Sequence, residues 1–214
     1  MRYLVVCGGK IDKEFGLNEI KTDGIDAIIA ADSGMDFLYE NGVTPDIIVG
    51  DFDSATTKAL EFFERKGQTE IHRLNPIKDD TDTEYAIRLA IREGARSIVV
   101  LGATGSRIDH VLGNISLLGI GLESKTDISI IDTNNRIRMA DKPVTIEKSA
   151  QYGRFVSLIA VTDDNEVSLR GFKYPVTDYS FDRFTSLGIS NEIVDDHALI
   201  DIHRGKFIII ESKD

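Results

Sequence analysis

The sequence predicts an α/β fold, with a mostly parallel, Rossmann-like open sheet and flanking helices, followed by an all-β sandwich. Two observations support this prediction. In the first half, short apolar runs alternate with segments of helical period, whereas helical periods disappear from about residue 134 and short β-type segments follow one another. The length of 214 residues suits two small domains. We therefore expect one domain over 1–133 and a second over 134–214.

The first half has the alternation expected of a parallel sheet. Apolar runs with the length of buried strands lie at 4–6, 27–31, 47–49, 98–101 and 128–131, and a further strand is expected at 70–74. Helical patterns lie between them at 35–39, 55–66, 83–93 and 108–118. Gly42, Gly67 and Gly94 stand just past three of these helices, where glycine commonly ends a helix. Strands that alternate with helices favour an open, largely parallel sheet.

The second half has the pattern of a small β domain. Strands are expected at 137–139, 144–146, 155–161, 166–170, 192–202 and 207–210, and turn-forming residues separate them. Short, closely spaced strands without helices are typical of a sandwich or a barrel.

Charge and cysteine content exclude several classes of protein. The 25 Lys and Arg residues against 36 Asp and Glu residues give a formal charge of −11, which disfavours nucleic-acid and anionic-membrane partners. The single cysteine, Cys7, excludes an internal disulfide and a multi-cysteine zinc site. It lies in an apolar strand and is expected to be buried. The absence of a long apolar run predicts a cytoplasmic protein without a membrane span.

Aspartates follow several of the predicted strands. Asp32 follows 27–31, Asp51 and Asp53 follow 47–49, and an acidic run at 79–82 opens the next helix. Ligands of open α/β sheets bind at these strand ends, so the carboxylates are expected to converge there. Helix capping is an alternative for each aspartate alone, and Thr81 with Glu84 forms a capping-box pattern. Crowded carboxylates are costly without a cation, and oxygen ligands select Mg²⁺ or Ca²⁺.

A glycine turn and a helix follow the strand at 98–101. Gly102 and Gly105 would let backbone amides approach a phosphate at the helix N-terminus. Arg107, His110 and Asn114 fall on one polar stripe of the helix, which suits the phosphates and the base or sugar of a nucleotide. The alternative is a solvated helix face. The buried face of this helix is expected to contain Ile108, Val111, Leu112, Ile115 and Leu118.

Two motifs resemble other phosphate enzymes only in part. Gly8-Gly9-Lys10 after the first strand lacks the upstream glycine and the Ser or Thr of a P-loop, so a conventional P-loop is rejected. Asp51-Phe52-Asp53 is similar to the aspartyl nucleophile and acid of haloacid-dehalogenase-type phosphatases. Ala55 departs from that pattern and a downstream Gly-Asp acid motif is missing, so we keep this activity as an alternative.

Taken together, the motifs resemble the thiamine pyrophosphokinases of bacterial type, over nearly the whole chain and in order. The matching segments are Ala31-Asp32-Ser33-Gly34, Pro45-Asp46 with Val49-Gly50-Asp51-Phe52-Asp53-Ser54, Lys78-Asp79-Asp80-Thr81-Asp82-Thr83-Glu84, Gly102 to His110 with Gly113-Asn114, Gly171-Phe172-Lys173-Tyr174-Pro175 and Gly188-Ile189-Ser190-Asn191-Glu192. The resemblance implies transfer of the terminal diphosphate of ATP to the hydroxyl of thiamine, which yields thiamine diphosphate and AMP. It also implies a homodimer whose active sites lie between subunits, with ATP and Mg²⁺ on the α/β domain and thiamine on the partner's β domain.

The resemblance assigns roles to individual residues. Asp51, Asp53 and Asp82 fall on the magnesium-binding positions. The chemistry of the transfer separately leads us to expect that one of these aspartates or Asp32 orients or deprotonates the thiamine hydroxyl, and the sequence leaves open which one. The nucleotide and substrate motifs contain Asp32, Thr81, Gly102, Gly105, Arg107, Asp109, His110 and Asn114. Ser190 and Asn191 fall on the thiamine-facing turn. Tyr174 and Phe207 are candidates to stack on cationic thiamine, with a place in the β-domain core as the alternative.

Two other functions compete with this activity. One is a magnesium-dependent phosphatase in which Asp51 forms an aspartyl phosphate, and the other is a nucleotide or thiamine sensor without turnover. The motif around Ser190 has no use in the phosphatase, and a sensor has less need of three convergent metal ligands. The diphosphotransferase is therefore the leading hypothesis.

Overall fold

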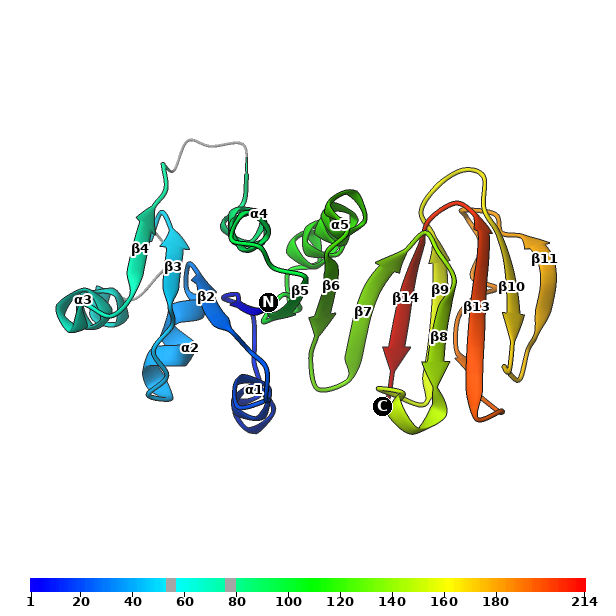
Figure 1. Ribbon diagram of the computed structural model, residues 1–214, viewed down its shortest axis with the longest axis horizontal. Helices are drawn as coiled ribbons and strands as arrows, with labels where there is room; N and C mark the ends of the chain where they lie inside the picture. The colour runs from blue at the N-terminus through cyan, green and yellow to red at the C-terminus, as the bar shows by residue number, and fades with distance from the viewer. Residues whose placement is uncertain (53–56, 76–79) are drawn as a thin grey trace. The chain divides into compact units, whose positions relative to one another are not determined.

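The computed structural model describes residues 1–52, 57–75 and 80–214 of the chain. It divides into two compact units, Met1–Thr133 and Asn134–Asp214. In the first unit strands alternate with helices, whereas the second consists of strands and one short 3-10 helix (Figure 1). The predicted fold class, a mostly parallel α/β sheet followed by an all-β part, is confirmed.

The first unit contains one parallel sheet and five described helices. Its strands and helices are β1 (Arg2–Val6), α1 (Lys13–Ile20), β2 (Ala27–Ala31), α2 (Gly34–Glu40), β3 (Ile47–Gly50), α3 (Thr57–Lys66), β4 (Glu70–Arg73), α4 (Asp82–Arg92), β5 (Ser97–Leu101), α5 (Ile108–Ser124) and β6 (Asp127–Ile131). The strand order is β6-β5-β1-β2-β3-β4, with every neighbouring pair parallel. The inner strands are apolar because helices cover both faces of such a sheet. Leu4, Ile29, Ile48 and Ile98 are accordingly buried.

The order of the strands reverses at β1. The chain steps from β1 through β2 and β3 to β4 on one side, and then returns to place β5 and β6 on the other side of β1. The connections after β1 and β5 therefore leave the sheet in different directions and open a crevice at the carboxyl ends of these strands. This reversal determines where a ligand can enter the first unit.

Two helices differ from the sequence prediction. Helix α1 was not predicted because it is short and contains Gly16, yet the Asp12 carboxylate caps it by accepting from the Phe15 amide at 2.9 Å. Helix α5 continues to Ser124. Its predicted buried face was wrong in part, because Leu118 is buried but Ile108 and Leu112 are 65% and 60% exposed.

The second unit is a sandwich of two antiparallel sheets. Its elements are β7 (Asn135–Ala140), β8 (Val144–Glu147), η1 (Lys148–Ala150), β9 (Phe155–Ala160), β10 (Glu166–Arg170), β11 (Val176–Ser180), β12 (Asn191–Glu192), β13 (His197–Arg204) and β14 (Phe207–Ser212). One layer has the strand order β12-β9-β14-β7, and the other layer is a separate four-stranded sheet with the order β11-β10-β13-β8. Side chains from both sheets form one apolar core, including Leu158, Val167, Ile200 and Phe207. Phe207 is thus a core residue.

The strand predicted at 192–202 was wrong, because two strands of different sheets share this segment. β12 pairs with β9 in one sheet, and β13 pairs with β8 and β10 in the other. The intervening turn at 193–196 carries the chain across the sandwich. Strand β11 was not predicted because its mostly exposed, polar side chains lack the apolar alternation of a strand.

A buried glutamate joins β7 and β14 in the second unit. The Glu211 side chain is fully buried, and Arg136 donates to its two oxygens at 2.9 and 2.7 Å. Arg138 donates to the same carboxylate at 2.9 Å, and the Tyr152 amide donates at 3.0 Å. A buried charge is tolerated only when it is paired and hydrogen-bonded in this way.

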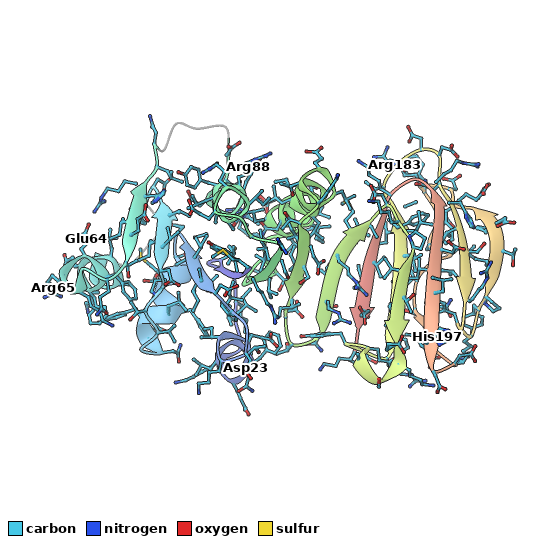
Figure 2. All side chains as sticks on the ribbon, in the orientation of Figure 1. Asp23, Glu64, Arg65, Arg88, Arg183 and His197 are labelled. Atoms are coloured by element: carbon cyan, nitrogen blue, oxygen red, sulfur yellow. The ribbon has the colours of Figure 1, made fainter. Side chains whose placement is uncertain are left out.

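Replacement of this glutamate is expected to destabilise the second unit strongly. Glu211→Gln removes the carboxylate charge that faces both guanidinium groups, and we expect the free energy of unfolding to fall by about 3–5 kcal/mol. Chemical denaturation followed by circular dichroism measures the loss. The control is Asp163→Asn, which breaks an exposed ion pair with Arg183 at the surface of the same unit (Figure 2) and should cost less than about 1 kcal/mol. Equal stability of the two variants would contradict the prediction.

Candidate active site

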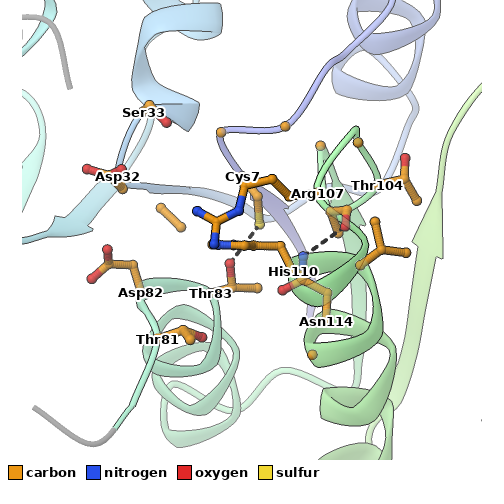
Figure 3. A pocket seen from close by; sticks show the side chains of 18 of the residues that line it. Cys7, Asp32, Ser33, Thr81, Asp82, Thr83, Thr104, Arg107, His110 and Asn114 are labelled. Carbon is orange, nitrogen blue, oxygen red and sulfur yellow. Dashed lines mark hydrogen bonds between the residues drawn. The ribbon is translucent and has the colours of Figure 1, made fainter. Parts of the chain in front are cut away.

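A pocket of about 910 Å³ lies at the carboxyl ends of β1, β2 and β5 (Figure 3). Four segments of the first unit line it: the β1–α1 connection, the β2–α2 junction, the start of α4, and the β5–α5 loop with the first half of α5. This volume is within the range of small-molecule and cofactor sites. The reversal of strand order at β1 therefore coincides with a pocket large enough for a nucleotide.

The loops after β1 and β5 are locked together at the floor of this pocket. The Gly9 amide donates to the Gly102 carbonyl at 2.9 Å, and a Cβ on Gly9 would lie 2.3 Å from that oxygen. Gly102 has a φ of +67°, and a Cβ there would lie 2.3 Å from the Cys7 carbonyl oxygen. Only glycine allows both loops this approach, so the backbone beneath the pocket is held in one arrangement.

Three aspartates converge beside the two loops. Ligand atoms of Asp32, Asp51 and Asp82 all lie within 4.8 Å of one another, and each residue is half-buried. Asp32 follows β2, Asp51 follows β3 and Asp82 begins α4, as the strand ends predicted. Asp53, the remaining predicted ligand, and Asp79 lie outside the described residues. Figure 3 shows Asp32 and Asp82 on one side of the pocket and Asn114 of α5 on the other.

Asp32 occupies an unfavourable position for an anion. Burial raises the pKa of its carboxyl group, and the negative charges of Asp82, Asp51 and Asp36 raise it further, against a smaller opposing hydrogen bond from the Ser33 backbone. Its Oδ1 atom is buried without a hydrogen-bond partner among the described residues. Its φ of 48° is uncommon outside glycine. A cation would relieve this electrostatic cost, and an all-oxygen donor set fits Mg²⁺ or Ca²⁺.

The start of α4 is fixed by its own cap and by β1. The Thr81 hydroxyl accepts from the Glu84 amide at 3.2 Å, which is one arm of the predicted capping box, while the Glu84 carboxylate pairs with Arg88. The Thr83 hydroxyl donates to the Cys7 sulfur at 3.3 Å. Burial raises the pKa of the Cys7 thiol to about 11, so the cysteine is a neutral, buried group, as predicted. These contacts hold Asp82 at the pocket.

The β5–α5 loop brings cationic and amide groups to the opposite wall. Arg107 donates to Asp109 at 2.7 and 3.3 Å, and this exposed pair raises the pKa of Arg107 and lowers the pKa of Asp109. The Asn114 side chain donates to the Ala103 carbonyl at 2.8 Å and so fixes the loop. His110 and Gly105 also line the pocket. All the predicted residues of this segment are therefore at the site, although Arg107 and Asn114 have partners within the chain.

The predicted thiamine-facing turn lies in the second unit. Ser190 has a φ of 60°, and its amide donates to the Ser157 hydroxyl at 2.9 Å. The Asn191 side chain is buried and exchanges hydrogen bonds with the Tyr174 backbone at 3.1 and 2.9 Å. The Tyr174 ring is 61% exposed, so Tyr174 is not a core residue. Other large exposed apolar side chains of this unit are Ile159, Tyr179, Phe184, Leu187, Ile189 and Val194.

Sequence reasoning assigned no site role to several residues that line the pocket. Ser33, Thr83 and Thr104 lie within the matched motifs without a role of their own, whereas Cys7, Gly8, Gly9 and Lys10 lie outside these motifs. Motif matching rejected Gly8-Gly9-Lys10 because it is not a P-loop. The strand order was the missing information, since the connection after the central strand borders the crevice only when β1 lies between β2 and β5.

The chain is similar to known proteins over most of its length. A family model described as "Thiamin pyrophosphokinase, catalytic domain" matches residues 21–131, and one described as "Thiamin pyrophosphokinase, vitamin B1 binding domain" matches residues 143–207. Thiamine pyrophosphokinase of Bacillus subtilis is 35% identical over 87% of this chain and 87% of its own length. The Bacillus subtilis crystal structure has a TM-score of 0.89 at 30% identity and covers 100% of both chains. The crystal structure of thiamin pyrophosphokinase from Geobacillus thermodenitrificans has a TM-score of 0.86 at 29% identity. The match covers 100% of this chain and 98% of the other.

None of the described helices has the length and apolar character that a membrane span requires.

Removal of the Asp32 charge is expected to stabilise the metal-free protein at neutral pH. Because the folded-state pKa of Asp32 is raised, ionisation of this carboxyl opposes folding, and the penalty is complete above that pKa. Asp32→Asn should therefore raise the melting temperature at pH 7 in the presence of a chelator. The gain should disappear as the pH falls below the unfolded-state pKa of about 3.9, where Asp32 is protonated in both states.

Melting curves from pH 3 to pH 8 test this expectation. Asp23→Asn is the matched control, because Asp23 is an exposed aspartate away from the cluster (Figure 2) and its substitution should leave the pH dependence unchanged. A variant Asp32→Asn that melts at or below the wild-type temperature at pH 7 would refute the electrostatic cost assigned to Asp32.

Proposed function

The chain belongs to the thiamine pyrophosphokinase family, and on this premise we propose that it transfers the diphosphate of ATP to the thiamine hydroxyl by a direct in-line step assisted by Mg²⁺. Membership makes it a diphosphotransferase that produces thiamine diphosphate and AMP. The observation that best supports the proposed mechanism is the convergence of Asp32, Asp51 and Asp82 on one side of a pocket whose other side is a glycine loop and a helix N-terminus. Such transfer depends mainly on positioning and charge neutralisation.

Asp51, Asp53 and Asp82 are the proposed ligands of the metal. Their carboxylates would hold Mg²⁺, which prefers oxygen ligands of this kind. Bound there, the ion supplies positive charge that offsets the charge developing on the departing AMP. The close approach of Asp51 and Asp82 and the orphaned oxygen of Asp32 support a cation at this place.

The β5–α5 loop is proposed to hold the phosphates. Gly102 and Gly105 leave the loop backbone accessible, so its amides can approach phosphate oxygens at the N-terminus of α5. Arg107 would exchange the Asp109 carboxylate for a phosphate, because both present paired oxygens to the guanidinium fork. Asn114 holds the loop through Ala103, and Thr81 holds the start of α4. His110 and Asp109 complete the proposed substrate contacts.

A carboxylate of the cluster is proposed to take the proton of the thiamine hydroxyl. Asp32 is our candidate, because its Oδ1 atom has no hydrogen-bond partner among the described residues and lies near the proposed metal ligands. A carboxylate at this place could accept a proton from an alcohol bound beside the aspartate cluster. No covalent intermediate on the protein is needed.

The second unit is proposed to bind thiamine, which makes 1–133 the nucleotide-binding domain and 134–214 the thiamine-binding domain. In this proposal the turn that contains Ser190 and Asn191 faces the thiamine, the buried Asn191 side chain holds the Tyr174 backbone, and the exposed Tyr174 ring can stack on the cationic ligand. We further propose a homodimer in which each active site combines the α/β domain of one subunit with the β domain of the other. A cytoplasmic location and the lack of nucleic-acid and membrane partners stay predictions.

The reaction itself is tested by product analysis. Protein incubated with ATP, Mg²⁺ and thiamine should release AMP and thiamine diphosphate in equal amounts, and only when thiamine is present. Liquid chromatography separates the products. Release of inorganic phosphate without thiamine would instead indicate the phosphatase, and binding without turnover would indicate a sensor.

The metal role of Asp82 is tested in the same assay. Asp82→Asn should lower turnover by about 100-fold or more, because it removes a charge aimed at the phosphate transfer, while the circular dichroism spectrum is unchanged. Glu93→Gln, at the far end of α4, is a control that removes a carboxylate outside the pocket. Turnover at the wild-type rate in Asp82→Asn would contradict the proposed role of Asp82 as a metal ligand.

The shared active site predicts recovery of activity when two inactive variants are mixed. Asp82→Asn disables the nucleotide domain, and Ser190→Lys puts a repelling cation at the exposed turn proposed for thiamine. Subunit exchange should restore about a quarter of the wild-type activity, since half of the dimers are mixed and half of their sites are intact. Sedimentation velocity checks the dimer. A mixture that stays inactive despite exchange, or an active monomer, would contradict the shared site.

A further inference from the structure

One face of α5 forms a wall of the pocket. His110, Gly113, Asn114 and Leu117 recur at helical spacing and all line the cavity. Gly113 stands between His110 and Leu117 in the interior of this 17-residue helix. Glycine is the least favourable helix residue apart from proline, so its presence there calls for a physical reason.

Other glycines of the first unit have such a reason within the chain. A Cβ on Gly16 in α1 would lie 2.6 Å from the Ile11 side chain, and one on Gly121 in α5 would lie 2.6 Å from the Thr126 carbonyl oxygen. Gly42 and Gly94 have positive φ angles that favour glycine at a turn. Close packing or backbone conformation therefore explains each of these positions.

Gly113 has neither reason. Its backbone is helical, and a Cβ built on it meets no atom of the described chain within 4 Å. Gly105, in the loop before α5, is not helical, but it likewise has no positive φ and no atom within 4 Å of a built Cβ, and both glycines line the same pocket. The space that a side chain would fill at Gly113 is therefore left open toward the pocket.

The charges along the wall indicate which part of a ligand reaches this space. The loop before α5 and its first turn carry Arg107 and Asp109, and the carboxylate cluster lies across the pocket. Farther along the same face, Gly113, Asn114 and Leu117 carry no charged side chain. A nucleotide with its phosphates at the loop would direct its uncharged portion along this stretch of helix.

We propose that Gly113 is the nucleoside-contact position of the pocket, where the absence of a side chain lets the base or ribose of the nucleotide pack against the α5 backbone. The proposal rests on the proposed function for the identity of the nucleotide. The proposal predicts opposite effects of Gly113→Ala on stability and on nucleotide affinity. Alanine stabilises the helix, and its methyl group fills the space that the nucleoside occupies.

The test compares Gly113→Ala with the wild type and with Ser116→Ala. Ser116 is an exposed residue of the same helix that does not line the pocket, so its alanine variant is the matched control. Calorimetry measures the dissociation constants of AMP, Mg·ATP and inorganic tripolyphosphate without thiamine. Gly113→Ala should weaken AMP and ATP binding by about 10-fold and leave tripolyphosphate unchanged. Its melting temperature should rise by about 2 °C.

The outcomes separate this proposal from its alternatives. Unchanged AMP binding, equal weakening of tripolyphosphate, or a lower melting temperature in Gly113→Ala would each overturn it. A selective rise in the KM for thiamine would place the other substrate at this wall and would also overturn it. AMP binding is measured without turnover, so it is independent of the product assay. If the wild-type protein failed to form AMP in that assay, the proposed function would be refuted, while the effect of Gly113→Ala on AMP binding could still be interpreted.

Discussion

The site depends on the contact between the loops that leave β1 and β5. Gly9 and Gly102 bring the two backbones close enough for a hydrogen bond and leave no room for a Cβ on either residue. This contact fixes the floor of the crevice that the reversed strand order opens. Cys7, directly after β1, accepts a hydrogen bond from Thr83 of α4, and Asn114 of α5 donates to the β5–α5 loop. These bonds connect both walls of the pocket to the two loops beneath it. A preorganised base of this kind suits chemistry that depends on positioning.

The aspartate cluster at the pocket carries an electrostatic cost to folding. Asp32 and Asp51 directly follow two neighbouring parallel strands and Asp82 begins α4, so the fold brings three like charges close together. The raised pKa of Asp32 expresses that cost. The second unit treats a buried charge differently, because Glu211 is surrounded by Arg136, Arg138 and a backbone amide. The Glu211 charge is therefore neutralised within the chain, whereas the raised pKa of Asp32 reflects burial and neighbouring negative charges.

Residue patterns predicted well wherever a local rule decides the structure. The buried strands of the first unit, the helix at α4 and the cap at Thr81 follow from apolar runs, helical period and hydrogen-bonding side chains. The failures have a shared origin in tertiary packing. Ile108 and Leu112 have the spacing of a buried helix face, yet the sheet covers other residues of α5. The segment 192–202 looks like one strand, but the two sheets of the sandwich divide it.

By itself, the sequence determined the two-part fold class, the family resemblance and the presence of aspartates at strand ends, because these depend on local periodicity and on motifs. Only the tertiary structure decided which carboxylates meet, since Asp32, Asp51 and Asp82 come from separate connections that the parallel sheet brings to one edge. It also decided that the β1–α1 loop borders the pocket and that Gly113 opens onto it. Strand order and free space are properties of packing between distant segments, and a linear pattern does not encode either one directly.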